Sequence, residues 1–439
     1  MESTEYDVVI IGGGISGCAL LYLLSRYSDL KNLCLVEKYP GLASVNSHGR
    51  NNSQTLHAGD IETNYTLEKA VSVKQGARMV ERYTESLANR AEVIFRYPKM
   101  VMGVGADEIG FLEQRFEEFS PCFPHMQLFR ETDIARIEPA IMDGRSEAVA
   151  ALAVTDDYSA VNFQLLSESF VEKAGQARGK RIDVRTATRV RGIEPLDEGF
   201  DVLTGETALR ARFVVVCAGG HSLLFAQQMG HGLHYSCLPI AGSFYYTPAI
   251  LNGKVYTVQN DKLPFAAIHG DPDLLAEGKT RFGPTALALP MLERYHYRTI
   301  LDFLRVVRPD RDVLRVLWDL MKVPEIRNYI LKNFLFEIPG IRRRLFLRDA
   351  RKIVPRLQLR DLRFARRTGG IRPVMIDKIH RRLHLGEAKI DTGLGIVFNM
   401  TPSPGATSCL QNGEKDLYII RDYLGCKVDE ARLRAELYD

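Results

Sequence analysis

The stretch YDVVIIGGGISGCALLYLL, at residues 6–24, decides the fold of this chain. Its first half is an apolar run that predicts a buried parallel strand, and its second half has helical periodicity. Between them Gly12, Gly14 and Gly17 form the spacing G-x-G-x-x-G. These glycines permit a tight turn, a close approach of the backbone to a pyrophosphate and close packing of helix on strand. The free N–H groups of the helix N-terminus are then expected to face the phosphates.

A second strand is expected at residues 32–38, and it contains Glu37, which stands 20 residues after Gly17. A carboxylate at this place accepts hydrogen bonds from the ribose of a bound dinucleotide. The β-α-β unit therefore predicts a dinucleotide site, with Ser16 and Lys38 as further contacts. NAD and FAD both use this fingerprint, so the unit alone leaves the choice between them open.

Two later segments favour FAD. A strand at residues 213–217 runs into Ala218 and Gly219, as in flavoproteins of the D-amino-acid-oxidase type, where a late strand returns to the nucleotide sheet. Residues 403–407 are then typical of a loop that opens a final helix, whose start would face the partly negative edge of a reduced flavin. The cofactor contacts expected from this loop are Pro404, Gly405, Ala406 and Thr407.

The whole pattern predicts an α/β protein: a Rossmann-like FAD-binding domain of glutathione-reductase or D-amino-acid-oxidase type, with an inserted antiparallel-sheet substrate domain of α+β character. Helical periodicity covers residues 67–87 and 162–177, and Tyr- and Val-rich strands lie within 242–259. The expected FAD domain consists of residues 1–75, 150–235 and 366–439. The expected substrate domain consists of residues 76–149 and 236–365.

Bulk composition limits the classes of function. The 439 residues carry a net charge of +4, too small to indicate nucleic acid as a partner. The seven cysteines are scattered and never spaced as C-x-x-C, which indicates reduced thiols and predicts no metal site. The apolar start lacks the basic flank of a signal peptide, and no stretch reaches the roughly 20 apolar residues of a spanning helix. We therefore expect a soluble or peripheral protein.

One segment departs from the balanced charge. Residues 294–367 hold 20 Lys+Arg and 8 Asp+Glu, a net of +12, with Leu, Val, Ile and Phe at helical spacings. Two interpretations stay open. Either the helices present solvated basic faces, or they lie on an anionic membrane surface.

Six motifs, in this order, resemble the malate:quinone oxidoreductases, especially the shorter, ε-proteobacterial type. The motifs are GGGISGC at 12–18, NNSQTLHAGDIETNYT at 51–66, PFAAIHGDPD at 264–273, RFGPTALALP at 281–290, GGIRP at 369–373 and NMTPSPGATSCLQN at 399–412. The resemblance spans essentially the whole chain. In the longer members the second motif is closer to NNAGTGHAA, so the residues at 53–55 are a departure that leaves the substrate contacts open.

The resemblance implies a peripheral flavoenzyme on the cytoplasmic side of the cell membrane. Such an enzyme oxidises (S)-malate to oxaloacetate and passes two electrons through FAD to a membrane quinone, which residues 294–365 would face. L-2-hydroxyglutarate dehydrogenases share the skeleton, so that acid and lactate stay open as substrates. An amino-acid oxidase and an FAD-binding protein without turnover are further alternatives.

Oxidation of a 2-hydroxy acid needs a base for the hydroxyl proton, and imidazole is well matched near neutral pH. Two histidines stand in the motifs, His57 and His269, with a slight preference for His269 as the base. The uncharged polar run before His57 suits the polar edge of a flavin. The flavin contacts expected there are Asn52, Ser53, Gln54 and Thr55.

The two carboxylates of malate call for guanidinium groups, which make paired, charge-assisted hydrogen bonds. Arg372 occupies the place where the resemblance puts a carboxylate-binding arginine, and Arg281 is the candidate for the second carboxylate. Tyr245 and Thr285 are expected to line the substrate pocket as hydroxyl donors.

Overall fold

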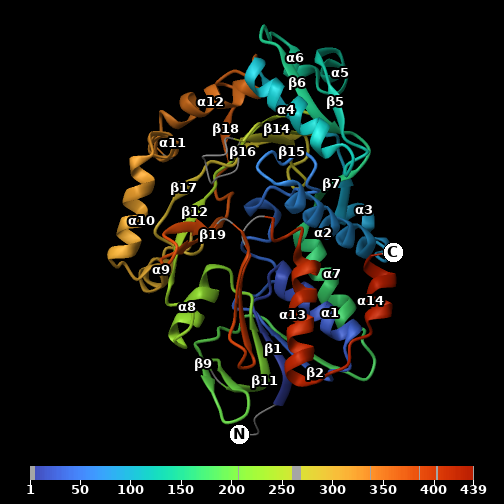
Figure 1. Cartoon of the computed structure of the whole chain (residues 1–439), viewed down its shortest axis with the longest axis vertical. Helices are drawn as coiled ribbons and strands as arrows, with labels where there is room; N and C mark the ends of the chain where they lie inside the picture. Colours follow the sequence, from blue (N-terminus) through green and yellow to red (C-terminus); the bar gives the residue numbers. More distant parts are fainter. Residues whose placement is uncertain are drawn as a thin grey trace.

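The computed structural model describes residues 5–205, 207–259, 268–336, 338–384, 386–401 and 404–438. The opening stretch forms β1 (Glu5–Ile11) and α1 (Ile15–Tyr27), and β2 (Asn32–Val36) follows. They belong to an eight-stranded sheet with the core order β21-β22-β11-β1-β2-β8. The strands β22, β11, β1, β2 and β8 run parallel to one another, whereas the edge strand β21 is antiparallel to β22. The predicted α/β nucleotide fold is thus confirmed (Figure 1).

The remaining strands of this first sheet come from distant parts of the chain. They are β8 (Arg181–Arg185), β9 (Gly192–Pro195), β10 (Phe200–Leu203), β11 (Ala208–Val216), β21 (Ala388–Asp391) and β22 (Ile396–Met400). The return of β11 to lie beside β1 is the late strand that the sequence predicts.

Helices pack on both faces of the first sheet because the residues of β1 alternate between two apolar cores. Val8 and Ile10 join the core formed with α1, α7 (Phe163–Gly175) and α13 (Cys409–Leu424). Val9 and Ile11 join the opposite core, to which α8 (Gly220–Gln228) contributes. The helix expected after residue 407 is α13, but it is not the final one, because α14 (Glu430–Leu437) follows it.

In the view of Figure 1, a second sheet and a small third sheet lie above the first. The second has the order β18-β13-β16-β15-β14-β4-β6-β5 and is antiparallel except where β14 pairs with β4. Its strands are β4 (Lys99–Val104), β5 (Gln127–Phe129), β6 (Val149–Val154), β13 (Tyr245–Pro248), β14 (Lys254–Thr257), β15 (His269–Pro272), β16 (Lys279–Gly283) and β18 (Arg363–Phe364). The third sheet has the order β17-β12-β19-β20.

The strands of the third sheet are β12 (Tyr235–Ala241), β17 (Leu287–Ala288), β19 (Ile371–Asp377) and β20 (Arg382–His384). Further elements lie between residues 49 and 161: a 3-10 turn (Gly49–Asn51), α3 (Arg90–Val93), β3 (Ile94–Arg96), α4 (Ala106–Phe119), α5 (Glu131–Ile137), α6 (Pro139–Met142) and β7 (Tyr158–Val161).

Three of the expected domain boundaries divide packed elements. The boundary at 75 falls inside α2 (Leu67–Glu85), whose apolar face packs in the same core as α1 and α13. The boundary at 150 falls inside β6, a strand of the second sheet, and β19, which was expected in the FAD domain, pairs with β12. Sequence pattern does not reveal these contacts, because sheet pairing and helix packing join segments that are remote in sequence.

The basic segment forms the predicted helices, α9 (Thr299–Val307), α10 (Arg311–Lys322), α11 (Pro324–Leu335) and α12 (Arg342–Ile353). They follow one another along one edge of the molecule, drawn in orange in Figure 1. Across the described ranges, no helix combines the length and the apolar character needed to cross a bilayer.

Candidate functional site

A cavity of about 540 Å³ opens at the carboxyl ends of β1 and β2 and extends to β19. This is where ligands bind in open α/β sheets. Fifteen of the residues that the sequence proposes for the site line it. They are Gly12, Gly14, Ser16, Glu37, Lys38, Asn52, Ser53, Thr55, His57, Ala218, Gly219, Arg372, Pro404, Gly405 and Ala406.

The glycine-rich turn has the geometry that the fingerprint requires. Gly12 has a φ of +114°, and a Cβ there would lie 2.4 Å from the carbonyl oxygen of Cys217. A Cβ at Gly17 would lie 2.0 Å from the carbonyl oxygen of Gly12, so Gly17 sets the close packing of helix on turn and does not line the cavity. The backbone around Gly14 at the start of α1 is thus free to face a ligand. The turn fits the pyrophosphate of a dinucleotide.

At the end of β2, Glu37 binds the backbone of this turn. Its carboxylate accepts hydrogen bonds from the N–H of Gly13 at 2.7 Å and of Tyr39 at 2.9 Å, while burial raises its pKa. Lys38 forms an ion pair with Glu293 across the cavity. Burial alone would raise the pKa of Glu293, but Lys38, His221 and His296 lower it to about 2.

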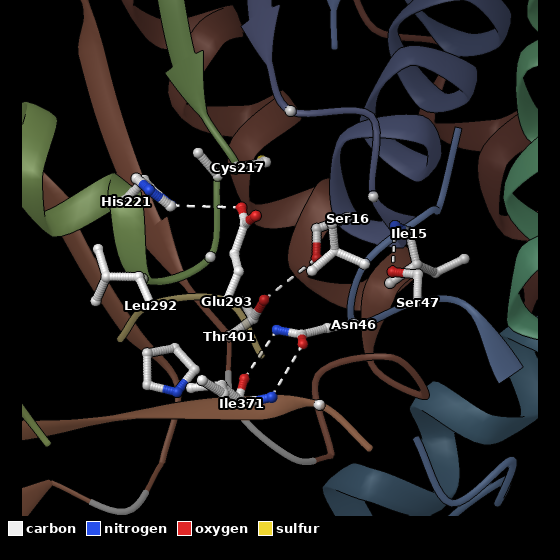
Figure 2. Close-up of a pocket in the computed structure, with 18 of the residues that line it drawn as sticks. Ile15, Ser16, Asn46, Ser47, Cys217, His221, Leu292, Glu293, Ile371 and Thr401 are labelled. Carbon is white, nitrogen blue, oxygen red and sulfur yellow. Dashed lines mark hydrogen bonds and ion pairs between the residues drawn. The ribbon is translucent and has the colours of Figure 1, made fainter. Parts of the chain in front are cut away.

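Several cavity residues are absent from the sequence prediction, and Figure 2 shows five of their contacts. Asn46 holds the backbone of Ile371, with its amide donating to the carbonyl at 2.9 Å and accepting from the N–H at 3.2 Å. Ser47 accepts from the N–H of Ile15 at 3.0 Å, and Ser16 lies 3.2 Å from Thr401. The fourth pair is His221 with Glu293, 3.7 Å apart. In the sequence, only the small polar residues within 44–53 indicate that Asn46 and Ser47 belong to the site.

His57 projects from the loop after this polar run. The backbone N–H of His57 donates to Oγ1 of Thr407 at 3.1 Å. Thr407 does not itself line the cavity, but this hydrogen bond holds the loop in place. Nδ1 of His57 lies 2.8 Å from Oε1 of Glu62. Gln54 is also structural: it has a φ of +53°, is 1% exposed, and its side chain donates to the carbonyl of Gly49 and accepts from the N–H of Leu274.

Arg372 reaches the same cavity from β19. Within the described ranges no carboxylate is among the groups that act on its charge, which are Tyr65, Tyr256 and Tyr329. Burial lowers the pKa of its guanidinium, and these tyrosines oppose that shift. An arginine that stays cationic without a carboxylate partner is suited to bind the carboxylate of a ligand.

His269, the preferred base from sequence, lies in β15 outside the cavity lining. It is 2% exposed, its ring stacks on Tyr256 at 4.5 Å, and neither ring nitrogen has a hydrogen-bond partner among the described residues. Burial lowers its pKa to about 3, although the charge of Asp271 opposes this shift. His269 is a neutral buried ring here, so the preference passes to His57. Residues 264–267 of its motif lie outside the described residues.

Three expected substrate contacts are placed elsewhere. Arg281 is fully buried, 3.3 Å from Asp273 and 3.7 Å from Asp271, so its charge is already compensated. Tyr245 stacks on Phe346 and its hydroxyl donates to the carbonyl of Phe336. Thr285 accepts from the N–H of Ser243 at 2.9 Å. The first two are structural contacts of the second sheet, the third joins two connecting segments, and none of the three residues lines the cavity.

The sequence and the fold both have known relatives. The family model described as FAD-dependent oxidoreductase matches residues 7–411. A probable malate:quinone oxidoreductase from Campylobacter jejuni is 46% identical over 100% of both chains. A malate:quinone oxidoreductase from Helicobacter pylori is 46% identical over 99% of this chain and 98% of that protein.

Solved structures share the fold at low identity. Glycine oxidase from Geobacillus kaustophilus has a TM-score of 0.66 at 15% identity, with 96% of this chain and 95% of that one covered. The dithionite-reduced L-α-glycerophosphate oxidase from Mycoplasma pneumoniae with FAD bound has a TM-score of 0.63 at 19% identity and the same coverage. These likenesses confirm the expected fold class.

Proposed function

The chain belongs to the FAD-dependent oxidoreductase family and, within it, to the malate:quinone oxidoreductases, and on this premise we propose that it oxidises malate to oxaloacetate with a quinone as electron acceptor. The observation that supports this function most is the position of His57 and Arg372. Both line the cavity that begins at the nucleotide-binding turn. The proposed base and the proposed carboxylate-binding cation therefore line the same cavity as the nucleotide-binding turn.

When bound, FAD supplies the acceptor for the hydride that leaves the hydroxyl-bearing carbon. The side chains do the remaining work. Arg372 binds a carboxylate of malate and so orients the substrate. Nε2 of His57 accepts the hydroxyl proton, because Nδ1 is engaged with Glu62. Since Arg281 is paired with Asp271 and Asp273, it does not bind the second carboxylate.

Rapid mixing with malate under anaerobic conditions tests this function. We expect malate to bleach the flavin absorbance, and His57→Asn to slow the bleaching by about 10²–10⁴-fold at unchanged FAD content. His125→Asn, which changes an exposed histidine that does not line the cavity, is the control. Lactate and 2-hydroxyglutarate belong in the same assay, because faster bleaching by either would reassign the substrate. No bleaching by any of the three acids would refute the enzymatic function.

We also propose that helices α9 to α11 bind the anionic cytoplasmic face of the cell membrane, where the quinone is dissolved. Large apolar side chains are exposed along them: Leu314 is 60%, Trp318 64% and Phe334 57% exposed. These helices belong to the wider segment 294–367, whose +12 charge excess complements anionic lipid. Residues 299–335 themselves hold 7 Lys+Arg and 5 Asp+Glu, and most of the excess lies just beyond them in residues 342–367. Of the three adjacent arginines in α12, Arg342 stacks on Phe364 and Arg343 donates to the carbonyl of Leu359. The apolar residues are therefore the sharper targets.

Flotation with liposomes of anionic lipid tests this surface. We expect Leu314→Ser with Trp318→Ser to lose binding, while the flavin content and malate-dependent bleaching stay as in the unchanged chain. Leu394→Ser is the matched control, because Leu394 is 62% exposed but stands beside the first sheet. Binding that persists in the double variant would refute the proposed surface and leave the chemistry untouched.

A further inference from the structure

His57 belongs to a cluster of charged groups that are shielded from solvent. The side chains of His57 and Glu62 are 14% and 9% exposed, and 2.8 Å separates Nδ1 from Oε1. Beside this pair, Lys99 at the start of β4 lies 2.6 Å from Asp60, with side chains 2% and 4% exposed. One loop and one strand thus bring together two carboxylates, an ammonium group and an imidazole.

The ionisation of the cluster follows from its mutual contacts. Burial alone would raise the pKa of Glu62, but the hydrogen bond from His57 and the charges of His57 and Lys99 hold it below its usual value. Burial alone would lower the pKa of Lys99, but the charges of Asp60 and Glu62 raise it. Glu62 is therefore a carboxylate and Lys99 an ammonium ion near neutral pH.

The other groups that face this cluster leave that balance in place. Arg115, from α4, donates to the main-chain carbonyl of Glu62 at 2.6 Å rather than to its carboxylate. Tyr65 stays neutral, since burial and the charge of Glu62 raise its pKa well above the usual range. Oε2 of Glu62 accepts no hydrogen bond from the residues that the structure describes. Lys99 is thus a buried cation that compensates this carboxylate, and the ring of His57 is its hydrogen-bond partner.

The carboxylate of Glu62 favours the positive charge that the ring gains during the reaction. Oε1 of Glu62 lies 2.8 Å from Nδ1 of His57, so an imidazolium ion formed there would face a carboxylate at hydrogen-bond distance. Proton transfer from a substrate hydroxyl to His57 is therefore favoured by a group that never touches the substrate.

We propose that Glu62 is a positioning residue for His57, fixing its proton on Nδ1 so that Nε2 accepts the hydroxyl proton, and that Lys99 keeps Glu62 ionised. This inference rests on the proposed function of His57. A carboxylate that orients an imidazole in this way also stabilises the imidazolium ion that forms.

Substitution of Glu62 tests the first part. We expect Glu62→Gln to lower the rate of flavin bleaching by malate about 10²–10⁴-fold at wild-type FAD content. In a plot of the bleaching rate against pH, the acid limb is the part where the rate rises with pH. This limb should move to lower pH, because Glu62→Gln removes the anion that stabilises the protonated imidazole of His57. Glu62→Asp keeps the charge and should recover part of the rate. A purely structural role would not move the acid limb.

Substitution of Lys99 tests the second part. Without this cation, burial raises the pKa of Glu62, so Lys99→Met should be slow at neutral pH and recover as pH rises and Glu62 ionises. Glu62→Gln has no such recovery, and Lys99→Arg should keep most of the rate. The matched control is Lys254→Met, since Lys254 is the register partner of Lys99, equally buried, and 2.6 Å from Asp271. We expect that change to weaken folding or FAD binding without moving the acid limb.

Nitrogen NMR of the unchanged chain with labelled histidine decides the matter even if the variants fail to fold. A proton on Nδ1 of His57 is the expected result, and a proton on Nε2 would overturn the inference. A Glu62→Gln protein with the wild-type rate and acid limb would also overturn it. If His57→Asn slows bleaching in that case, the proposed function survives. If His57→Asn leaves bleaching at the wild-type rate, the proposed role of His57 fails as well.

Discussion

The nucleotide-binding half and the substrate-side half of this molecule build their parts of the site by different means. On the nucleotide side the backbone defines the cavity, through Gly12, Gly14 and the end of β2. On the substrate side the second sheet carries buried charges that neutralise one another, such as Lys254 with Asp271 and Arg281 with Asp273. The geometry of the first half thus depends on the space that glycine leaves because it has no side chain. The geometry of the second half depends on which buried charged groups form ion pairs.

The largest expected effect tests the backbone side of this comparison. Gly17→Ala places a Cβ 2.0 Å from the carbonyl oxygen of Gly12, and Gly12→Ala combines a 2.4 Å clash with a φ of +114°. Because each clash is with backbone, it cannot be relieved by a rotamer change, and we expect loss of FAD binding and of most soluble protein. Flavin absorbance of the purified variants measures this. A Gly17→Ala protein with full FAD content would show that the turn tolerates displacement.

The two arginines test the charge side. Arg281→Met removes one partner of a fully buried cluster, so we expect the free energy of unfolding to fall by about 3–5 kcal/mol. Arg372→Met leaves the described fold without a broken ion pair, so we expect little loss of stability. The KM for malate should instead rise, by about 30-fold or more for a lost charge-assisted contact of at least 2 kcal/mol. Urea unfolding and steady-state kinetics separate the two.

If Arg281 bound malate and Arg372 stabilised the fold, the effects of the two variants on KM and on unfolding would be exchanged. If Arg281→Met raised KM while unfolding at the wild-type urea concentration, its ion pairs would not hold in solution. The lysine variant of each position refines the test, because Lys keeps the charge but not the paired hydrogen bonds.

The same contrast explains which parts of the site could be predicted from sequence. The fingerprint at 12–17 and Glu37 act through local spacing, so their position follows once strand and helix are recognised. Arg281 and Arg372 are both strand arginines beside motif glycines, and only the pairing of β16 with β15 shows that Arg281 meets Asp271 and Asp273. Asp60, Glu62 and Lys99 are likewise joined by tertiary contacts. Sequence spacing carries no information on such pairs.

The pH dependence of folding sharpens the comparison, because the two halves titrate in different ranges. His269, in the second sheet, has a pKa of about 3 against an ordinary 6.5. The unfolded chain gains a proton below 6.5 that the folded chain does not take up, so stability is complete above pH 6.5 and falls toward pH 3. Glu293, at the nucleotide end, has a pKa of about 2 against 4.5, so its contribution is present above pH 4.5 and is lost toward pH 2.

We therefore expect His269→Asn to flatten the stability profile between pH 6.5 and 4.5, and Glu293→Gln to flatten it only below pH 4.5. Urea unfolding across this range measures both profiles. An unchanged slope between pH 6.5 and 4.5 in His269→Asn would show that the ring is accessible to protons in the folded state.

The smallest expected effect concerns a glycine that no contact requires. Gly110 lies within α4, where a Cβ would meet no described atom within 4 Å. Glycine in a helix costs about 0.5–1 kcal/mol relative to alanine, so Gly110→Ala should raise the free energy of unfolding by about that amount and leave FAD content unchanged. The thermal unfolding of Gly110→Ala should be compared with that of Gly17→Ala. The same added methyl group is expected to stabilise α4 and to disrupt the turn at the start of α1. A loss of stability in Gly110→Ala would mean that α4 packs against a partner surface that a single chain does not show.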